Sequence, residues 1–158
     1  MKLNLNKPFI KVIGLAGIAG MRTMTPLAIL AEKLSKSKRP RLLKSNLSFM
    51  QSSVFSGLMN LAALGEFLGD KSKSAPNRTD LGGIIGRAMS GALTGATIYK
   101  SAFKNPYKGA LIGSVSAVIF TYAFFEVRKR ISAQKNINKN VIAIAEDALA
   151  VSGGMLFI

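Results

Sequence analysis

The sequence predicts an all-α integral membrane protein: a helical bundle with about five membrane segments, in a single domain over residues 1–158. Three observations predict this fold class. The composition is 49% hydrophobic, with a mean hydropathy of +0.29. The apolar residues gather into five runs that approach the length of a membrane segment. The basic residues cluster between these runs, as is typical of loops at a membrane surface.

The charge balance bears on the expected partners. The chain has 22 Lys and Arg residues against 7 Asp and Glu residues, a formal charge of +15. In a soluble protein this would suggest nucleic acid, but no expected helix carries a basic face with interleaved aromatics, so we expect no nucleic-acid partner. The expected partners are the lipid bilayer and its anionic headgroups. Cysteine and histidine are absent, so we expect neither a metal nor a cofactor.

The first apolar segment, residues 7–34, is too long for one straight crossing of a hydrocarbon core about 30 Å thick. Arg22 interrupts it, and Thr25 followed by Pro26 is a helix-start signal with Thr25 as the N-cap. We therefore expect a helix to about Gly20, an irregular stretch, and a second helix from Pro26. The free N–H groups of that second helix, beside Arg22, form a potential anion site. The alternative is a proline-kinked helix whose Arg22 pairs with a buried acid.

The N-terminal residues and the first loop are simpler. Residues 1–7 form a short basic leader, which also resembles the start of a cleaved secretory signal. However, the apolar run resumes directly after Arg22, which favours a retained membrane segment. Residues 32–46 hold six basic residues and one acid. They are expected to form a solvated loop that touches headgroups.

Two further segments carry isolated charges. Residues 47–69 contain Glu66, and Asp70 follows one helical turn later on the same face. A turn-rich loop over residues 70–80 contains Arg78 and ends at Asp80 or Thr79, either of which suits the N-cap of the next helix.

The third segment, residues 81–99, contains Arg87. Helical spacing places Arg87 beside Gly83, Ser90, Gly91 and Thr94, and opposite Ile85 and Met89. This small and polar stripe is expected to face other helices. Gly91 and Gly95 form a GxxxG pair beside the same stripe, which permits close helix approach.

The last two segments differ in charge. Residues 109–125 contain no charge, and Gly109, Gly113 and Ala117 repeat every four residues as a close-packing groove. Residues 141–158 contain the adjacent acids Glu146 and Asp147. Two acids in an apolar helix are expected to be paired, protonated or in contact with water. The segment is short, so a re-entrant or tilted helix is also compatible with it.

The charges within the apolar segments nearly balance, which favours a buried ion-pair network. Arg22 or Arg87 is expected to face the Glu146–Asp147 pair, with Glu66 as a second partner. The candidate binding or ion-pair residues are Arg22, Thr25, Glu66, Asp70, Arg78, Arg87, Glu146 and Asp147. Lys and Arg are divided almost evenly between the two sets of loops, with a slight preference for a cytoplasmic N-terminus. So weak a bias also suits dual insertion and an antiparallel homo-dimer.

Several motifs, in their order along the chain, resemble an uncharacterised bacterial family of small multi-span membrane proteins known as a domain of unknown function. They are GMRTMTP at residues 20–26, Gly-Glu at 65–66 with Asp-Lys at 70–71, PNRT at 76–79, Arg87 with Gly-Ala at 91–92, and Glu-Asp at 146–147. The resemblance covers nearly the whole chain. It implies a multi-pass protein of the bacterial inner membrane and marks the charged positions as the residues of interest. It implies no activity.

Three functions follow from these expectations. The first is a transporter or channel-like protein whose charged network handles an ion or an anionic group. The second is a structural or assembly protein whose buried ion pairs only fix helix packing. The third, a lipid-modifying enzyme with Glu66 or Asp147 as the base, is least favoured. The chain offers no Ser/His, Cys/His or metal-ligand constellation, so we do not expect an enzyme.

Overall fold

The computed structural model describes residues 7–69, 80–132 and 139–158. In these ranges every regular element is a helix, which confirms the all-α part of the prediction. The elements are α1 (Pro8–Met21), α2 (Thr25–Lys36), α3 (Pro40–Leu43), the 3₁₀ helix η1 (Ser48–Gln51), α4 (Ser53–Gly69), α5 (Leu81–Ser101), α6 (Pro106–Ser132) and α7 (Lys139–Leu156).

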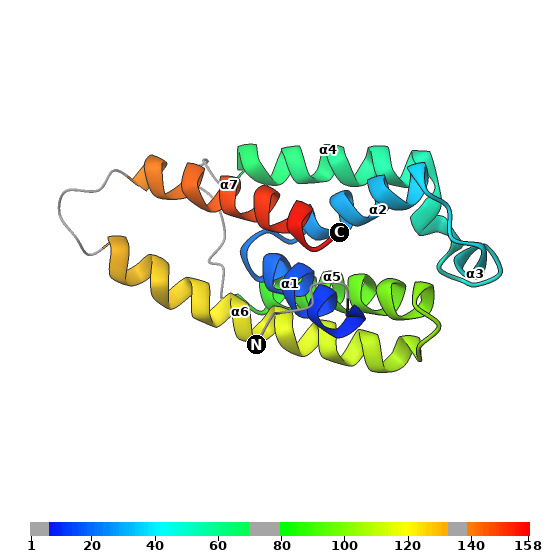
Figure 1. Cartoon of the computed structure of the whole chain (residues 1–158). Coiled ribbons are helices and arrows are strands. Elements are labelled where there is room, and N and C mark those ends of the chain that lie inside the picture. The colour runs from blue at the N-terminus through cyan, green and yellow to red at the C-terminus, as the bar shows by residue number, and fades with distance from the viewer. Residues whose placement is uncertain (1–6, 70–79, 133–138) are drawn as a thin grey trace.

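The helix α1 lies at the centre of the bundle (Figure 1). Every residue from Leu15 to Met21 is buried. One side of α1 packs against α5 and α6, and the other side packs against α7 and α2. The helix α4 covers α2 and forms the opposite outer face from α5 and α6. Apart from Lys11, all residues of α1 are apolar, and such a helix is expected at a central place.

The break predicted near residues 20–26 is present, and the chain also reverses direction there. Gly154 of α7 lies beside both arms, because a Cβ atom added to it would contact Ile29 of α2 and, at 3.6 Å, Ile18 of α1. Just after the end of α7, the ring of Phe157 lies where a Cβ atom on Gly14 of α1 would be. Both α1 and α2 therefore run beside α7 from one apex near Arg22. They form a helical hairpin whose two open ends lie at the same end of the bundle.

The glycine pairs predicted to allow close packing lie between α5 and α6. A Cβ atom at Gly95 would come within 2.1 Å of the backbone oxygen of Gly109, and one at Gly113 within 2.0 Å of that of Gly91. These contacts confirm the close approach predicted from the GxxxG pair and from the four-residue repeat. Side chains at these positions would separate the two helices.

Two boundaries differ from the prediction. The expected loop over residues 32–46 is partly helical, because α2 continues to Lys36 and α3 follows, with the Leu42 side chain fully buried. Residues 47–52 do not belong to the second apolar helix: Ser48–Gln51 form the 3₁₀ turn η1, and α4 begins only at Ser53. Gln51 explains part of this, because its side-chain oxygen accepts a hydrogen bond from the Arg39 backbone N–H and ties η1 to α3.

The helix α6 is longer at both ends than the predicted segment. It begins at Pro106, a favoured first helical residue, and the Asn105 side chain accepts from the Tyr107 N–H at 2.9 Å. Among the described residues, 106–131 form the single helix that is both long and apolar enough to cross a membrane. Only 17% of its most apolar window is buried within the chain.

Candidate functional site: a charged centre at the helix break

The break between α1 and α2 begins at Arg22. The Arg22 N–H donates to the Ile18 carbonyl at 2.8 Å, which closes the last turn of α1, and the Arg22 backbone then becomes extended. The next helix starts at Thr25, with Pro26 in its first turn. Thr23 and Met24 thus present backbone N–H groups that no helical turn uses.

The predicted cap of α2 is wrong. Met24 occupies the N-cap position, and no side chain of the helix itself caps it. Thr25 is the first helical residue, and its buried hydroxyl has no hydrogen-bond partner within the described ranges. The cap comes from α4, because the Glu66 carboxylate accepts from the Thr23 N–H at 2.7 Å and from the Met24 N–H at 2.9 Å. The chain thus places its own anion at the helix N-terminus that the sequence marked as an anion site.

Arg22 joins the hairpin to two other helices. Its side chain is only 3% exposed and forms an ion pair with the Asp147 carboxylate of α7. Its Nη1 also donates to the Glu66 carbonyl of α4 at 3.3 Å, and the guanidinium carbon lies 5.1 Å from the centroid of the Phe67 ring. The structure therefore brings Arg22, Glu66 and Asp147 together, as their charges predicted. Phe67 was not predicted, since an aromatic residue in an apolar run gives no separate signal.

Glu146 has a partner on another helix. Its carboxylate accepts from Nη1 of Arg128 of α6 at 3.1 Å. Adjacent helical residues point about 100° apart, so Glu146 and Asp147 reach different helices. The sequence analysis missed Arg128 because the fourth apolar segment was expected to end at residue 125, with a loop after it, whereas α6 extends through Arg128.

Arg87 lies on the buried stripe of α5, as predicted. It is 7% exposed, and Ser90 and Thr94 on the same face are buried, whereas Ile85 and Met89 on the other face are exposed. The Ser90 hydroxyl donates to the Thr23 carbonyl at 2.5 Å. The α5 stripe thus packs on the apex of the hairpin. The remaining two candidates, Asp70 and Arg78, lie outside the described residues.

The charged centre, defined here as Arg22, Glu66, Asp147 and the Thr23–Met24 backbone, is closed by contacts within the chain. Both carboxylates are already engaged: Glu66 accepts from two backbone N–H groups, and Asp147 forms an ion pair with Arg22. To act as a base, either would first have to leave these partners. The arrangement joins α1, α2, α4 and α7 at one point, which a hydrogen-bonded ionic cluster does well in a low-dielectric interior.

Comparison with known proteins gives a family but no activity. No curated protein and no solved structure matches the chain. The model of a family described as a domain of unknown function, DUF4126, matches residues 10–158. This agrees with the resemblance to an uncharacterised domain family drawn from the sequence motifs. The chain belongs to the DUF4126 family.

Proposed function

We propose that the protein is a multi-pass membrane protein whose charged centre locks the helices of the bundle together. The membrane location is supported by an inverted distribution of side chains. On α4 the outward stripe is Val54, Leu58, Leu61, Leu64 and Leu68, with Leu61 67% and Leu68 71% exposed. The interior holds Arg22, Arg87, Thr94, Thr97 and Thr121. Soluble monomers rarely expose so continuous an apolar face, and charges inside membrane proteins face the interior of the bundle.

Helix lengths refine the number of crossings. The helices α4, α5, α6 and α7 have 17, 21, 27 and 18 residues, or about 25 to 40 Å at 1.5 Å per residue, against a core of about 30 Å. Each arm of the α1–α2 hairpin is shorter, with 14 and 12 residues. We infer four crossing helices and one re-entrant hairpin. An irregular backbone at membrane depth is tolerated where protein surrounds it, as at this apex.

The basic end of the bundle, where α2 ends and α3 and the α5–α6 turn lie, is at the right of Figure 1. It carries exposed cations such as Lys36, Lys38, Arg41 and Lys104. Although Lys and Arg are divided almost evenly along the chain, we propose from the positive-inside rule that this end faces the cytoplasm of the bacterial inner membrane. Because the chain has no cysteine, single-cysteine variants Lys38→Cys and Lys129→Cys test this directly. An impermeant thiol reagent added to intact cells should label only Lys129→Cys, and labelling of Lys38→Cys would refute this orientation.

The structural role of the charged centre is carried by one observation: the Glu66 carboxylate occupies the N-terminus of α2. A transport site for an anion needs those donors to be available, and here the chain itself uses them. The Arg22–Asp147 ion pair completes the closure from the α7 side. A buried ionic cluster of this kind fixes helix register.

A second candidate, the handling of an ion or an anionic group, has a specific observation in its favour. A groove with a volume of about 630 Å³ between α2 and α5 reaches Thr23 and Ser90, beside the apex of the hairpin. Broken helices at the middle of a bundle are typical of transporter binding sites. In this function the Glu66 carboxylate acts as a tethered anion that an external one displaces.

Flux measurements on the full chain in proteoliposomes separate the two functions. The probes are chloride, phosphate, potassium and protons, measured for the wild type, for the double variant Arg22→Gln Asp147→Asn, and for the surface control Glu32→Gln. The structural function predicts no flux above protein-free vesicles for any of them. Wild-type flux that the double variant loses and the control keeps would overturn the structural function in favour of the second candidate.

A further inference from the structure

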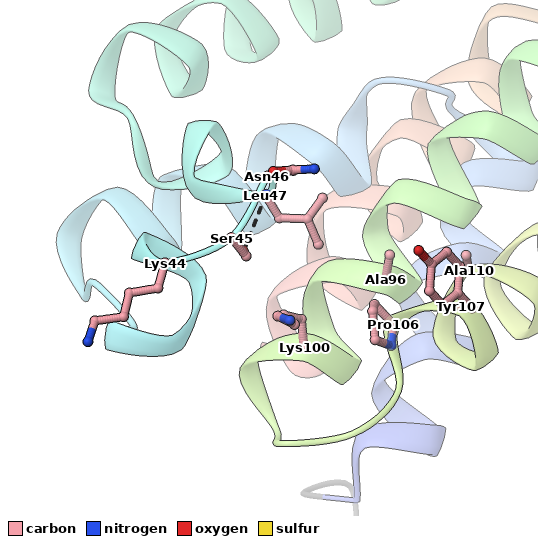
Figure 2. A pocket seen from close by; sticks show the side chains of 9 residues that line it. All are labelled: Lys44, Ser45, Asn46, Leu47, Ala96, Lys100, Pro106, Tyr107 and Ala110. Atoms are coloured by element: carbon pink, nitrogen blue, oxygen red, sulfur yellow. Dashed lines mark hydrogen bonds between the residues drawn. The ribbon is translucent and has the colours of Figure 1, made fainter.

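The basic end of the bundle contains a pocket with a volume of about 440 Å³ (Figure 2). The segment after α3 contributes Lys44 and Asn46 to it, the last turn of α5 contributes Lys100, and the first turn of α6 contributes Tyr107. In Figure 2 Asn46 extends over the pocket and the Tyr107 hydroxyl points toward it, whereas Lys44 extends outward. The flexible four-carbon stem of Lys44 lets its ammonium group turn back to the rim.

This pocket has a neighbour on each side, and the two neighbours differ in chemistry. Lys44 and Lys100 also line a second pocket, together with Arg41 and Phe103, and the Arg41 guanidinium lies 4.3 Å from the Phe103 ring centroid. On the other side, Ala96 and Ala110 are shared with the 630 Å³ groove between α2 and α5. That groove is lined mainly by apolar residues, among them Met24, Leu27, Met89 and Leu93. The three spaces adjoin one another through these shared lining residues, and we call them together the path; its surroundings change from cationic to apolar.

The cations on this path have no carboxylate close to them in the sequence. The chain has no Asp or Glu from residue 33 to 65 or from 81 to 125, and these two stretches supply nearly the whole path. The basic end therefore attracts anions. A ligand that fills the path must carry negative charge at one end and a long apolar body at the other.

We propose that this path is a binding site for an anionic phospholipid, with its phosphate between Lys44 and Lys100 and an acyl chain in the α2–α5 groove. The proposal rests on the membrane location proposed above but not on the role of the charged centre. A soluble phosphate compound would leave the apolar groove unused. A second copy of the chain would bring a second basic surface, which repels the first.

Lipid binding to the full chain, purified in detergent, tests the headgroup position. Native mass spectrometry would compare retention of phosphatidylglycerol and phosphatidylcholine by the wild type and by Lys44→Gln Lys100→Gln. Each interfacial cation is expected to change the affinity for an anionic lipid about five-fold, so the double variant should lose about thirty-fold of the preference. The matched control is Lys38→Gln Lys108→Gln, which removes two exposed charges from the same end outside the pocket. Equal losses in both double variants would overturn the specific site.

Photo-crosslinking tests the acyl-chain position. Phosphatidylglycerol with a photoreactive acyl chain, in vesicles that contain the protein, should label Met24, Met89 and Leu93 in preference to Leu61 on α4. Ala96→Phe, placed where the pocket and the groove meet, should reduce that labelling at least five-fold while the variant stays monodisperse. Labelling that is equally strong on α4, or that is suppressed by free glycerophosphate, would refute the lipid site. Crosslinks between two copies through the groove would also refute it.

The proposed lipid site and the proposed membrane location are contradicted by different results. A chain that is monodisperse in buffer without detergent contradicts the membrane location itself. A chain that needs detergent but shows no preference for phosphatidylglycerol contradicts only the lipid site.

Discussion

The charged centre and the basic end both contain cationic side chains, but the surroundings of these side chains differ. In the centre, the Arg22 guanidinium has a carboxylate opposite it, and a second carboxylate caps the adjoining helix. At the basic end, Lys44 and Lys100 lie in stretches without any acid. Burial explains the difference, because an ion removed from water needs a partner, whereas an ion at an interface is stabilised by water and headgroups. The paired charges of the centre therefore belong to the fold, whereas Lys44 and Lys100 are open to a ligand.

The largest loss of stability is expected when the carboxylate opposite Arg22 is removed. Asp147→Leu should lower the free energy of unfolding by about 3 kcal/mol, because it leaves a buried guanidinium without that counter-charge. The measurement is equilibrium unfolding of the full chain in mixed micelles. A loss no larger than that of a surface variant would place Arg22 in water and remove the distinction between the two regions.

The next effect concerns the cap of α2. Glu66→Gln keeps one acceptor oxygen but removes the charge, and a charge-assisted hydrogen bond is worth about 1.5 to 3 kcal/mol, so we expect a loss of about 2 kcal/mol. The matched control is Glu32→Gln, whose carboxylate pairs with Lys36 at the surface. It should change stability by less than about 0.5 kcal/mol. Similar losses in both variants would contradict the capping role.

An intermediate loss of stability is expected at the Arg128–Glu146 ion pair. The Arg128 side chain is 29% exposed, against 3% for Arg22, whereas the partner carboxylates Glu146 and Asp147 are 12% and 20% exposed. Arg128→Gln should therefore cost about 1 kcal/mol, between the surface and buried limits. Unfolding in the same micelles gives the ranking, and a cost above that of Asp147→Leu would show that burial does not set the order.

The smallest effect on stability is expected at the basic end. Lys44→Gln Lys100→Gln should change the free energy of unfolding by less than about 0.5 kcal/mol in neutral detergent, as is usual for surface positions. Added phosphatidylglycerol should raise the melting temperature of the wild type but not that of this variant. A large loss of stability without lipid would show that these lysines belong to the fold.

The sequence was sufficient for the features that follow from local rules. The break near Arg22 follows from a charge and a proline within one apolar run, and the buried face of α5 follows from helical spacing around Arg87. The close approach of α5 and α6 follows from glycines four residues apart. Each of these rests on residues that are near one another in the chain.

The features that the sequence did not predict depend on contacts between distant segments. The reversal of the chain after Arg22 depends on α7, which packs against both arms of the hairpin. The cap of α2 comes from Glu66, some forty residues away, and competes successfully with the local cap expected at Thr25. The pocket at the basic end likewise forms only where the segment after α3 meets α5 and α6. No periodicity or spacing along the chain encodes such meetings.

The central claim is that the buried Arg22 and the partly exposed Asp147 stabilise the bundle as an ion pair, and a double-mutant cycle tests it most directly. The free energies of unfolding of the wild type, Arg22→Leu, Asp147→Leu and the double variant would be measured in mixed micelles. We predict a coupling energy of at least about 2 kcal/mol, with the double variant more stable than Asp147→Leu alone. A coupling energy below about 0.5 kcal/mol, the value of an exposed pair, would contradict the account.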